Sequence, residues 1–291
     1  MKLRLGALLV ALAGTATATC PPQGETTVSL QALKADKWLR PDTERQALAL
    51  ALLDCLSDPS PLLRDGIAFE GLQFWMRSGK IDKPTLQALR LRLMAMLAAP
   101  ADPAGFTQAF AALVLAEVAR VDRLQGHLSD EERAALVDQA TNYLAGVRDY
   151  RGYDEQEGWR HGVAHGADVM LQLSLNKRLQ RSQADALLAA IASQVLPPGE
   201  VAYRHGETDR LAAPVFYLAQ GALLASADWE RWFLALAERR QRTPTSAVSL
   251  AQRHNLSSFL NSLYVAVQEA GPPDLQARLL PGLRKALREA E

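Results

Sequence analysis

The chain has 291 residues, of which 48% are hydrophobic and 22% charged, and it carries 32 basic and 32 acidic side chains. This composition is typical of a globular protein with a sizeable core and excludes disorder as the default state. The lack of a basic surplus argues against nucleic acid as a partner, because phosphate binding needs clustered positive charge.

The first eighteen residues are typical of a secretory signal peptide. Lys2 and Arg4 precede an apolar run at residues 5–13, and Ala16-Thr17-Ala18 is an A-x-A cleavage site. We therefore expect a periplasmic or secreted protein that is cleaved near Ala18. The apolar run is too short to span a bilayer and no longer one follows, so we expect no membrane span.

Two cysteines, Cys20 and Cys55, remain after this cleavage. Disulfides persist in the compartments that exported proteins reach, so a Cys20–Cys55 bridge is expected to tie the new N-terminus to the first helices. The alternative is a buried, reduced Cys55 in its apolar run beside a free Cys20. No CxxC pair is present, which argues against a structural zinc site.

Beyond the signal peptide at residues 1–18, we predict an N-terminal extension at 19–42 and one all-helical domain at 43–291. Proline and capping residues divide this domain into helices, as at Pro84 and in the capping box that begins at Ser129. About eleven helices are expected. They cover residues 44–56, 62–78, 84–99, 106–124, 129–148, 158–175, 182–195, 211–224, 228–240, 247–268 and 273–289.

The predicted fold class is all-α, with the helices in an α-α superhelical, HEAT-like array. Helix pairs of about 40 residues have the length of such repeats, which stack into curved solenoids. No repeat consensus is visible between the pairs, and no window alternates long enough to predict a strand.

One stretch gathers chemically capable side chains at a useful spacing. If residues 158–175 form a helix, His161, His165 and Asp168 stand at positions i, i+4 and i+7 and share one face. The rest of that helix is almost free of charge, which indicates burial on most sides. Gly162 and Gly166 would then allow a neighbouring helix to approach closely.

Three interpretations of this face remain open. His161, His165 and Asp168 could bind a metal ion, because histidines at i and i+4 can be ligands. One histidine could instead act as a general base oriented by Asp168. The three side chains could also form a satisfied network that fixes helix packing. The sequence identifies no cofactor.

Polar residues outside this helix could complete a cleft. Glu207, Asp209 and Arg210 lie in a predicted loop before the helix at 211–224, and loops on a rigid scaffold often carry function. Arg151 lies in the loop before the helix at 158–175, and Trp159, in the first turn of that helix, could belong to the core or form the wall of a groove. Another polar group, Arg253-His254-Asn255, lies in the helix at 247–268.

The same motifs resemble those of a bacterial family known only as a domain of unknown function, with a DxRGY…GWxHxxAHxAD core. Here the core reads Asp149-Tyr-Arg-Gly-Tyr153 and Gly158-Trp-Arg-His-Gly-Val-Ala-His-Gly-Ala-Asp168, and Glu207-Thr-Asp-Arg-Leu211 is similar to a later acidic motif. The resemblance covers roughly residues 45–265. It implies an all-helical fold and no established activity, cofactor or catalytic residue.

The predicted function is that of a binding or interaction module whose polar cleft contains the 161–168 side chains. Its partner would be a protein, a peptide or a small molecule, since helical arrays offer concave surfaces. The alternative is a metal-assisted or His/Asp-dependent hydrolase that uses the same cleft.

Overall fold

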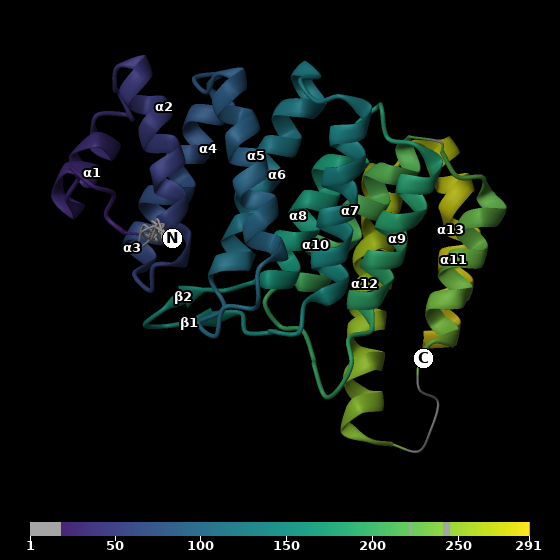
Figure 1. Cartoon of the computed structure of the whole chain (residues 1–291). Helices are drawn as coiled ribbons and strands as arrows, with labels where there is room; N and C mark the ends of the chain where they lie inside the picture. The colour runs from purple at the N-terminus through teal and green to yellow at the C-terminus, as the bar shows by residue number, and fades with distance from the viewer. Residues whose placement is uncertain (1–18, 222, 241–244, 291) are drawn as a thin grey trace, which may run out of the picture.

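The structure, a computed structural model, describes residues 19–221, 223–240 and 245–290 (Figure 1). The predicted signal peptide lies outside the described residues. The α-helices are α1 (Thr27–Ala35), α2 (Asp42–Ala51), α3 (Pro61–Leu63), α4 (Glu70–Arg77), α5 (Lys83–Ala98), α6 (Thr107–Gln125), α7 (Asp130–Gly146), α8 (Gly162–Ser174), α9 (Arg181–Val195), α10 (Glu207–Gln220), α11 (Ser226–Glu238), α12 (Ala247–Ala270) and α13 (Pro273–Ala290). A 3-10 helix, η1 (Leu52–Ser57), and a π-helix, η2 (Arg64–Phe69), lie between α2 and α4.

The helices pack side by side along the molecule (Figure 1). In one layer α4 packs on α6, α6 on α8, α8 on α10 and α10 on α12, while α5, α7 and α9 form a second layer. Consecutive helices join the layers, as α5 does with α6 and α7 with α8. One buried apolar cluster runs through the described helices. The predicted all-helical, single-domain fold is confirmed.

Helix ends follow local sequence signals. Ser129 caps α7 by accepting a hydrogen bond from the backbone of Glu132, whose carboxylate accepts one from the backbone of Ser129. Asp82 caps α5, and Pro84 stands in the first turn of that helix. Gly126 ends α6 in the left-handed conformation. These devices fix where each helix starts and stops, and with it the loops that carry the site.

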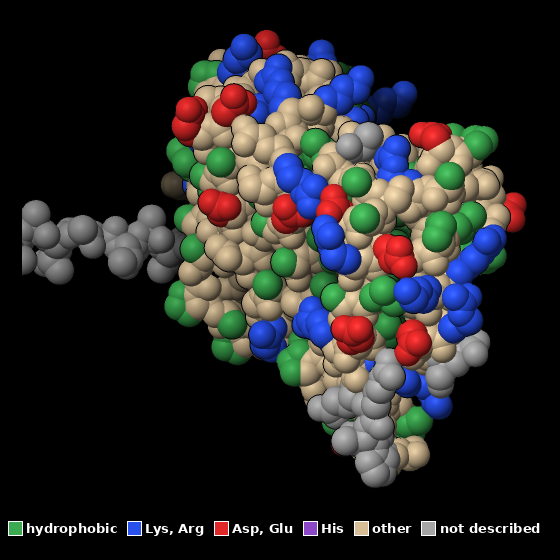
Figure 2. All heavy atoms as spheres, turned by 90° about the vertical axis from the view of Figure 1, so that its right-hand side faces the viewer, with side chains coloured by type: hydrophobic (Ala, Val, Ile, Leu, Met, Phe, Trp, Pro, Cys, Tyr) green, Lys and Arg blue, Asp and Glu red, His purple; other side chains and the backbone are tan. Residues whose placement is uncertain are grey.

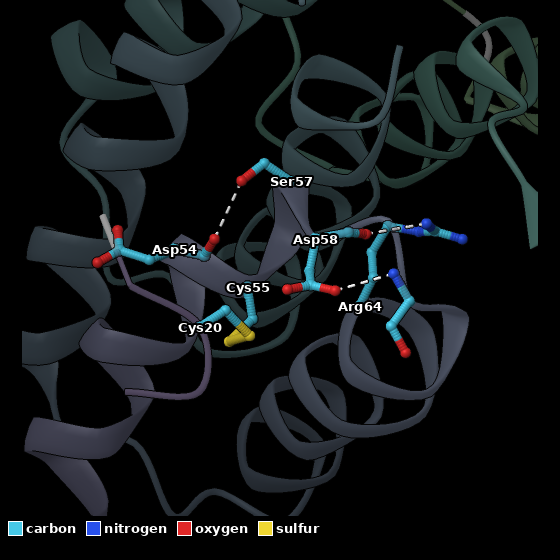
Figure 3. The surroundings of a disulfide bond; sticks show 7 residues. Cys20, Asp54, Cys55, Ser57, Asp58 and Arg64 are labelled. Atoms are coloured by element: carbon cyan, nitrogen blue, oxygen red, sulfur yellow. Dashed lines mark hydrogen bonds between the residues drawn. A yellow bond between two sulfur atoms is a disulfide. The ribbon is translucent and has the colours of Figure 1, made fainter. Parts of the chain in front are cut away.

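The predicted N-terminal extension is part of the helical domain. It contains α1, whose Leu30 and Leu33 are buried in the common core. Cys20, which precedes α1, forms a disulfide with the fully buried Cys55 of η1 (Figure 3). The bridge therefore fastens the start of the described chain to the layer that carries α4.

The described part of the chain contains no helix that is long and apolar enough to cross a membrane. Figure 2 views the C-terminal end of the array, where basic and acidic side chains are interspersed. That face agrees with the balanced charge of the sequence.

Candidate functional site

The predicted helix at 158–175 begins late, and a short hairpin replaces its first turn. Strands β1 (Tyr153–Asp154) and β2 (Gly158–Trp159) pair antiparallel. The backbone of Arg160 donates to Gly152, and that of His161 donates to Arg151. Gly158 and His161 both have left-handed φ angles, +75° and +57°, which a right-handed helix excludes. The helix therefore starts at Gly162.

His161 is the N-cap residue of α8 and not a helical residue, which corrects the predicted i, i+4, i+7 arrangement on one helix face, although its carbonyl oxygen still accepts the N–H of His165. Its ring stacks on Trp159, with centroids 4.6 Å apart. Its Nε2 lies 3.1 Å from the carbonyl oxygen of His205, to which it donates. Burial lowers the pKa of His161, and the nearby carboxylate of Glu207 opposes that effect only partly.

His165 lies inside the helical layer. Its Nδ1 donates to the carbonyl oxygen of Ala109 in α6 at 3.2 Å, and the ring meets Phe110 edge to face. Burial lowers the pKa of His165 to about 3, so the imidazole is neutral at physiological pH. This residue belongs to the contact between α6 and α8.

Asp168 and Arg210 form a forked ion pair between α8 and α10. Nε of Arg210 lies 2.9 Å from Oδ1 of Asp168, and Nη2 lies 2.5 Å from Oδ2. Burial raises the pKa of Asp168, although Arg210 acts in the opposite direction. Both carboxylate oxygens are engaged by Arg210, so Asp168 orients neither histidine.

The rings of His161 and His165 lie close, with centroids 5.8 Å apart, but the three predicted ligands are each engaged elsewhere. Both histidines donate to backbone carbonyls, and Asp168 is bound to Arg210. In residues 19–221, 223–240 and 245–290, no group of three or more His, Cys, Asp or Glu side chains is arranged to hold a metal ion.

Glu207 is the carboxylate that meets histidines. It is buried in the first turn of α10, which begins four residues before the predicted helix at 211–224. Its Oε2 accepts the backbone N–H of His205 at 2.8 Å. Its Oε1 lies 3.8 Å from Nε2 of His161 and 3.7 Å from Nδ1 of His205. Asp209, also predicted for the cleft, is exposed on α10 and lines neither of the cavities described next.

Two adjoining cavities open beside these residues. The polar cavity, of about 800 Å³, lies between residues 148–154 and residues 200–207. The apolar cavity, of about 520 Å³, lies between the end of α5, the start of α6 and the second half of α7. Arg148, Asp149 and Arg160 line both cavities. A ligand of moderate length could therefore occupy both.

The loop between the cavities is held by arginines. Arg151 donates to both carboxylate oxygens of Asp149 and also to the carbonyl oxygen of Pro103 at 3.1 Å. Arg160 donates to the carbonyl oxygen of Ala104 at 2.7 Å. Arg64 of η2, fully buried, donates to the carbonyl oxygen of Glu157 at 2.7 Å. These bonds fix the hairpin against η2 and the loop that precedes α6.

The site gathers some of the predicted residues and adds others. Arg151 and Glu207 line the polar cavity, and Trp159 and His161 stack beside them, whereas His165, Asp168 and Arg210 form helix contacts. Sequence reasoning missed the walls of the apolar cavity, which come from the successive helices α5, α6 and α7. No local pattern marks such walls, because each helix contributes only a few residues to them.

Comparisons with known proteins give one match. A family model described as a protein of unknown function (DUF2785) matches residues 93–265, more than half of the chain. No curated protein and no solved structure shows significant similarity to it. The matched range includes every residue that lines the two cavities. The chain belongs to this family of proteins of unknown function.

Proposed function

We propose that the protein is an exported binding module whose ligand occupies the polar and apolar cavities. The observation that carries the proposal is their junction at Arg148, Asp149 and Arg160. Each cavity has the size of a small-molecule site, and each is concave with a few convergent polar groups. A ligand with an apolar part and a polar part complements this pair.

The walls of the cavities are preorganised, which lowers the entropic cost of binding. Gln194 of α9 donates to the carbonyl oxygen of Leu144 at the end of α7. The Tyr203 hydroxyl donates to the carbonyl oxygen of Gln194 at 2.9 Å. These bonds tie α7, α9 and the wall of the polar cavity into one unit before any ligand arrives.

The apolar cavity also holds polar groups that are free to contact a ligand. Gln139 and Asn142 stand three residues apart on α7, so their side chains lie on the same helix face. Neither carboxamide is hydrogen-bonded to any part of the chain that the structure describes. Each offers one acceptor and two donors.

The HEAT-like arrangement and export are parts of the same proposal. The stacking of helix pairs in two layers supports a HEAT-like array, and the signal pattern together with the Cys20–Cys55 bridge supports an oxidising compartment. Non-reducing mass spectrometry of protein collected from the periplasm or medium should find the chain beginning near Thr19 and no alkylatable thiol. An intact Met1 or two alkylated cysteines would contradict export through this signal.

The binding proposal is tested with the dye anilinonaphthalene sulfonate, which has an apolar ring system and one anionic group. Ala98 lines the apolar cavity at the exposed end of α5, so Ala98→Trp fills the cavity without disturbing the core. We expect saturable dye fluorescence with wild type and its loss in Ala98→Trp. The matched control is Ala95→Trp, one turn earlier on α5 and outside the cavity. Equal dye binding by all three proteins would refute the proposal.

A hydrolase remains the second candidate, with Glu207 in place of the predicted Asp168. His205 lines the polar cavity, and its Nδ1 faces the buried carboxylate of Glu207 at 3.7 Å. A histidine oriented by a carboxylate can act as a general base, with effects of about a hundredfold or more on rate. Chromogenic acetyl and phosphate esters test this idea. If His205→Ala still hydrolyses these esters at the wild-type rate, His205 and Glu207 are not a catalytic pair.

A further inference from the structure

The segment at residues 201–204, between α9 and α10, belongs to no helix or strand, and the hydrogen bonds of its backbone indicate an extended path. A single side chain, Asn255 of α12, donates to the carbonyl oxygen of Val201 at 2.7 Å and accepts the N–H of Tyr203 at 2.8 Å. The C=O of one residue and the N–H of the second residue after it therefore face the same side. That geometry belongs to an extended backbone.

Backbone groups of every second residue continue to bond on this same side as far as the start of α10. His254 bonds through Nε2 to the carbonyl oxygen of Tyr203 at 3.0 Å. Glu207 accepts the N–H of His205, and His161 donates to the carbonyl oxygen of His205. The C=O of Val201 and both backbone groups of Tyr203 and His205 thus bond to side chains of the fold.

The even-numbered residues face the other way. Ala202 and Arg204 line the polar cavity, and their backbone N–H and C=O groups form no hydrogen bond with residues in the described ranges. In an extended strand the groups of successive residues point in opposite directions. The N–H and C=O groups of residues 202 and 204, which we name the open strand edge, are therefore directed away from Asn255, and both residues are exposed in the wall of the polar cavity.

We propose that the open strand edge binds an extended polypeptide segment by strand addition, with an apolar side chain of that segment in the apolar cavity. The inference rests on the proposed binding function and names the class of ligand. In strand addition, main-chain hydrogen bonds supply affinity and pockets for alternate side chains supply specificity.

The charges around the cavity favour a polypeptide main chain over a small ion. Arg204 and Glu200 both line the polar cavity, and neither forms an ion pair within the described chain. A cavity lined by both signs of charge selects no single sign of ligand, whereas a neutral main chain offers both donors and acceptors. Gln139 and Asn142 in the apolar cavity can pair with peptide groups in the same way.

The test begins with the full chain as bait for a displayed library of random decapeptides. One selected peptide, acetylated and amidated at its ends, is then titrated against wild type. Methylation of the peptide nitrogens, one residue at a time, should weaken binding about tenfold at the residues that face the edge and have little effect at the residues between them. This periodicity of two is specific to strand addition.

A variant of the protein gives the reciprocal measurement. Ala202→Pro removes one N–H of the open strand edge and retains an extended backbone, so we expect about tenfold weaker peptide binding. The control is Glu155→Pro in the hairpin turn, whose N–H also has no described partner and which lies outside both cavities. It should bind as wild type does. If Ala202→Pro fails to fold, the methylated peptides decide the question alone.

Failure of this inference is distinguishable from failure of the binding function. Methylation tolerated equally at every peptide residue, or full binding by Ala202→Pro, would overturn strand addition. Selection of no peptide, while anilinonaphthalene sulfonate still enters the apolar cavity, would also overturn it and leave the binding module intact. Loss of both dye and peptide binding would refute both.

Discussion

Two neighbouring regions use the same kinds of residue in opposite ways. Where α8 contacts α6 and α10, His165 is hydrogen-bonded to the carbonyl oxygen of Ala109, and Asp168 forms an ion pair with Arg210. In the segment that leads into α10, the backbone groups of Ala202 and Arg204 have no described partner, and both residues line the polar cavity. The first region fastens helices together, and the second leaves hydrogen-bonding capacity open.

The comparison indicates that burial separates the two histidines: the buried one stabilises helix packing, and the partly exposed one is available to a ligand. His165 is buried and bonded to a helix carbonyl, and it lines neither cavity. His205 has a side chain 28% exposed and lines the polar cavity. Mutation of each residue separates a packing role from a binding role.

The largest expected effect is that of His165→Ala. Removal of the buried ring leaves a cavity beside Phe110 and breaks the bond to Ala109. We expect a loss of about 2–4 kcal/mol in the free energy of unfolding, measured by urea denaturation. His205→Ala, the matched change in the open region, should cost less than about 1 kcal/mol. Equal losses would erase the distinction between the two regions.

The pH dependence of stability provides the next largest effect. The pKa of His165 is about 3 in the folded protein, whereas an unfolded chain takes up that proton near pH 6.5. The unfolded state therefore binds more protons between these values, and stability falls as the pH drops through that window. The contribution of this one residue is about 1.4 kcal/mol per pH unit.

Comparison of wild type with His165→Gln isolates this contribution. Glutamine does not titrate and can still donate to the carbonyl oxygen of Ala109. Because the pKa of His161 and that of His127 are also lowered by burial, some slope remains in both proteins. Identical slopes between about pH 6 and pH 4 would show that His165 is accessible to protons in the folded state.

Gly166→Ala tests how closely α8 meets α7. A Cβ there would lie 2.9 Å from Cδ1 of the fully buried Leu144 and 3.2 Å from Cε1 of Tyr143. Overpacking costs about 1–3 kcal/mol, and better helix propensity returns about 1 kcal/mol, so we expect a net loss of about 1 kcal/mol. Gly146→Ala on α7 is the control, because its Cβ meets nothing within 4 Å. A higher melting temperature for Gly166→Ala would mean that this contact is loose.

The helices were predictable because their signals are local. The capping box at Ser129 and the proline after Asp82 mark helix starts within a few residues. The start of α8 was not predictable, because a hairpin bond from Arg160 to Gly152 replaces its first turn. The start of α10 was also missed, since the polar residues of its first turn, such as Glu207, read as a loop.

The candidate site was predictable only where its residues are close in the chain. Arg151, Trp159 and His161 are close in the chain and stand together, although Trp159 and His161 were predicted in a helix. The apolar cavity depends on α5, α6 and α7, and the open strand edge depends on Asn255 from α12. Backbone groups carry no residue signature, so only the fold reveals which of them lack partners.

The smallest expected effect on stability is that of Gly152→Ala in the open region. A Cβ on Gly152 would lie 2.1 Å from Nδ1 and 2.6 Å from Cε1 of His205, so the ring must move. Because this ring is only partly buried, it can swing toward the polar cavity at little cost. We expect a change of less than about 0.5 kcal/mol in unfolding free energy.

The same substitution should nevertheless change the site. Displacement of His205 shifts the end of the open strand edge, so the NMR signals of its ring should move and binding of a selected peptide should weaken. Glu155→Ala in the hairpin turn is the control, because it keeps Gly152 and His205 as they are. A large loss of stability with unchanged ring signals would place His205 in a closed contact like that of His165, and the two regions would then not differ in kind.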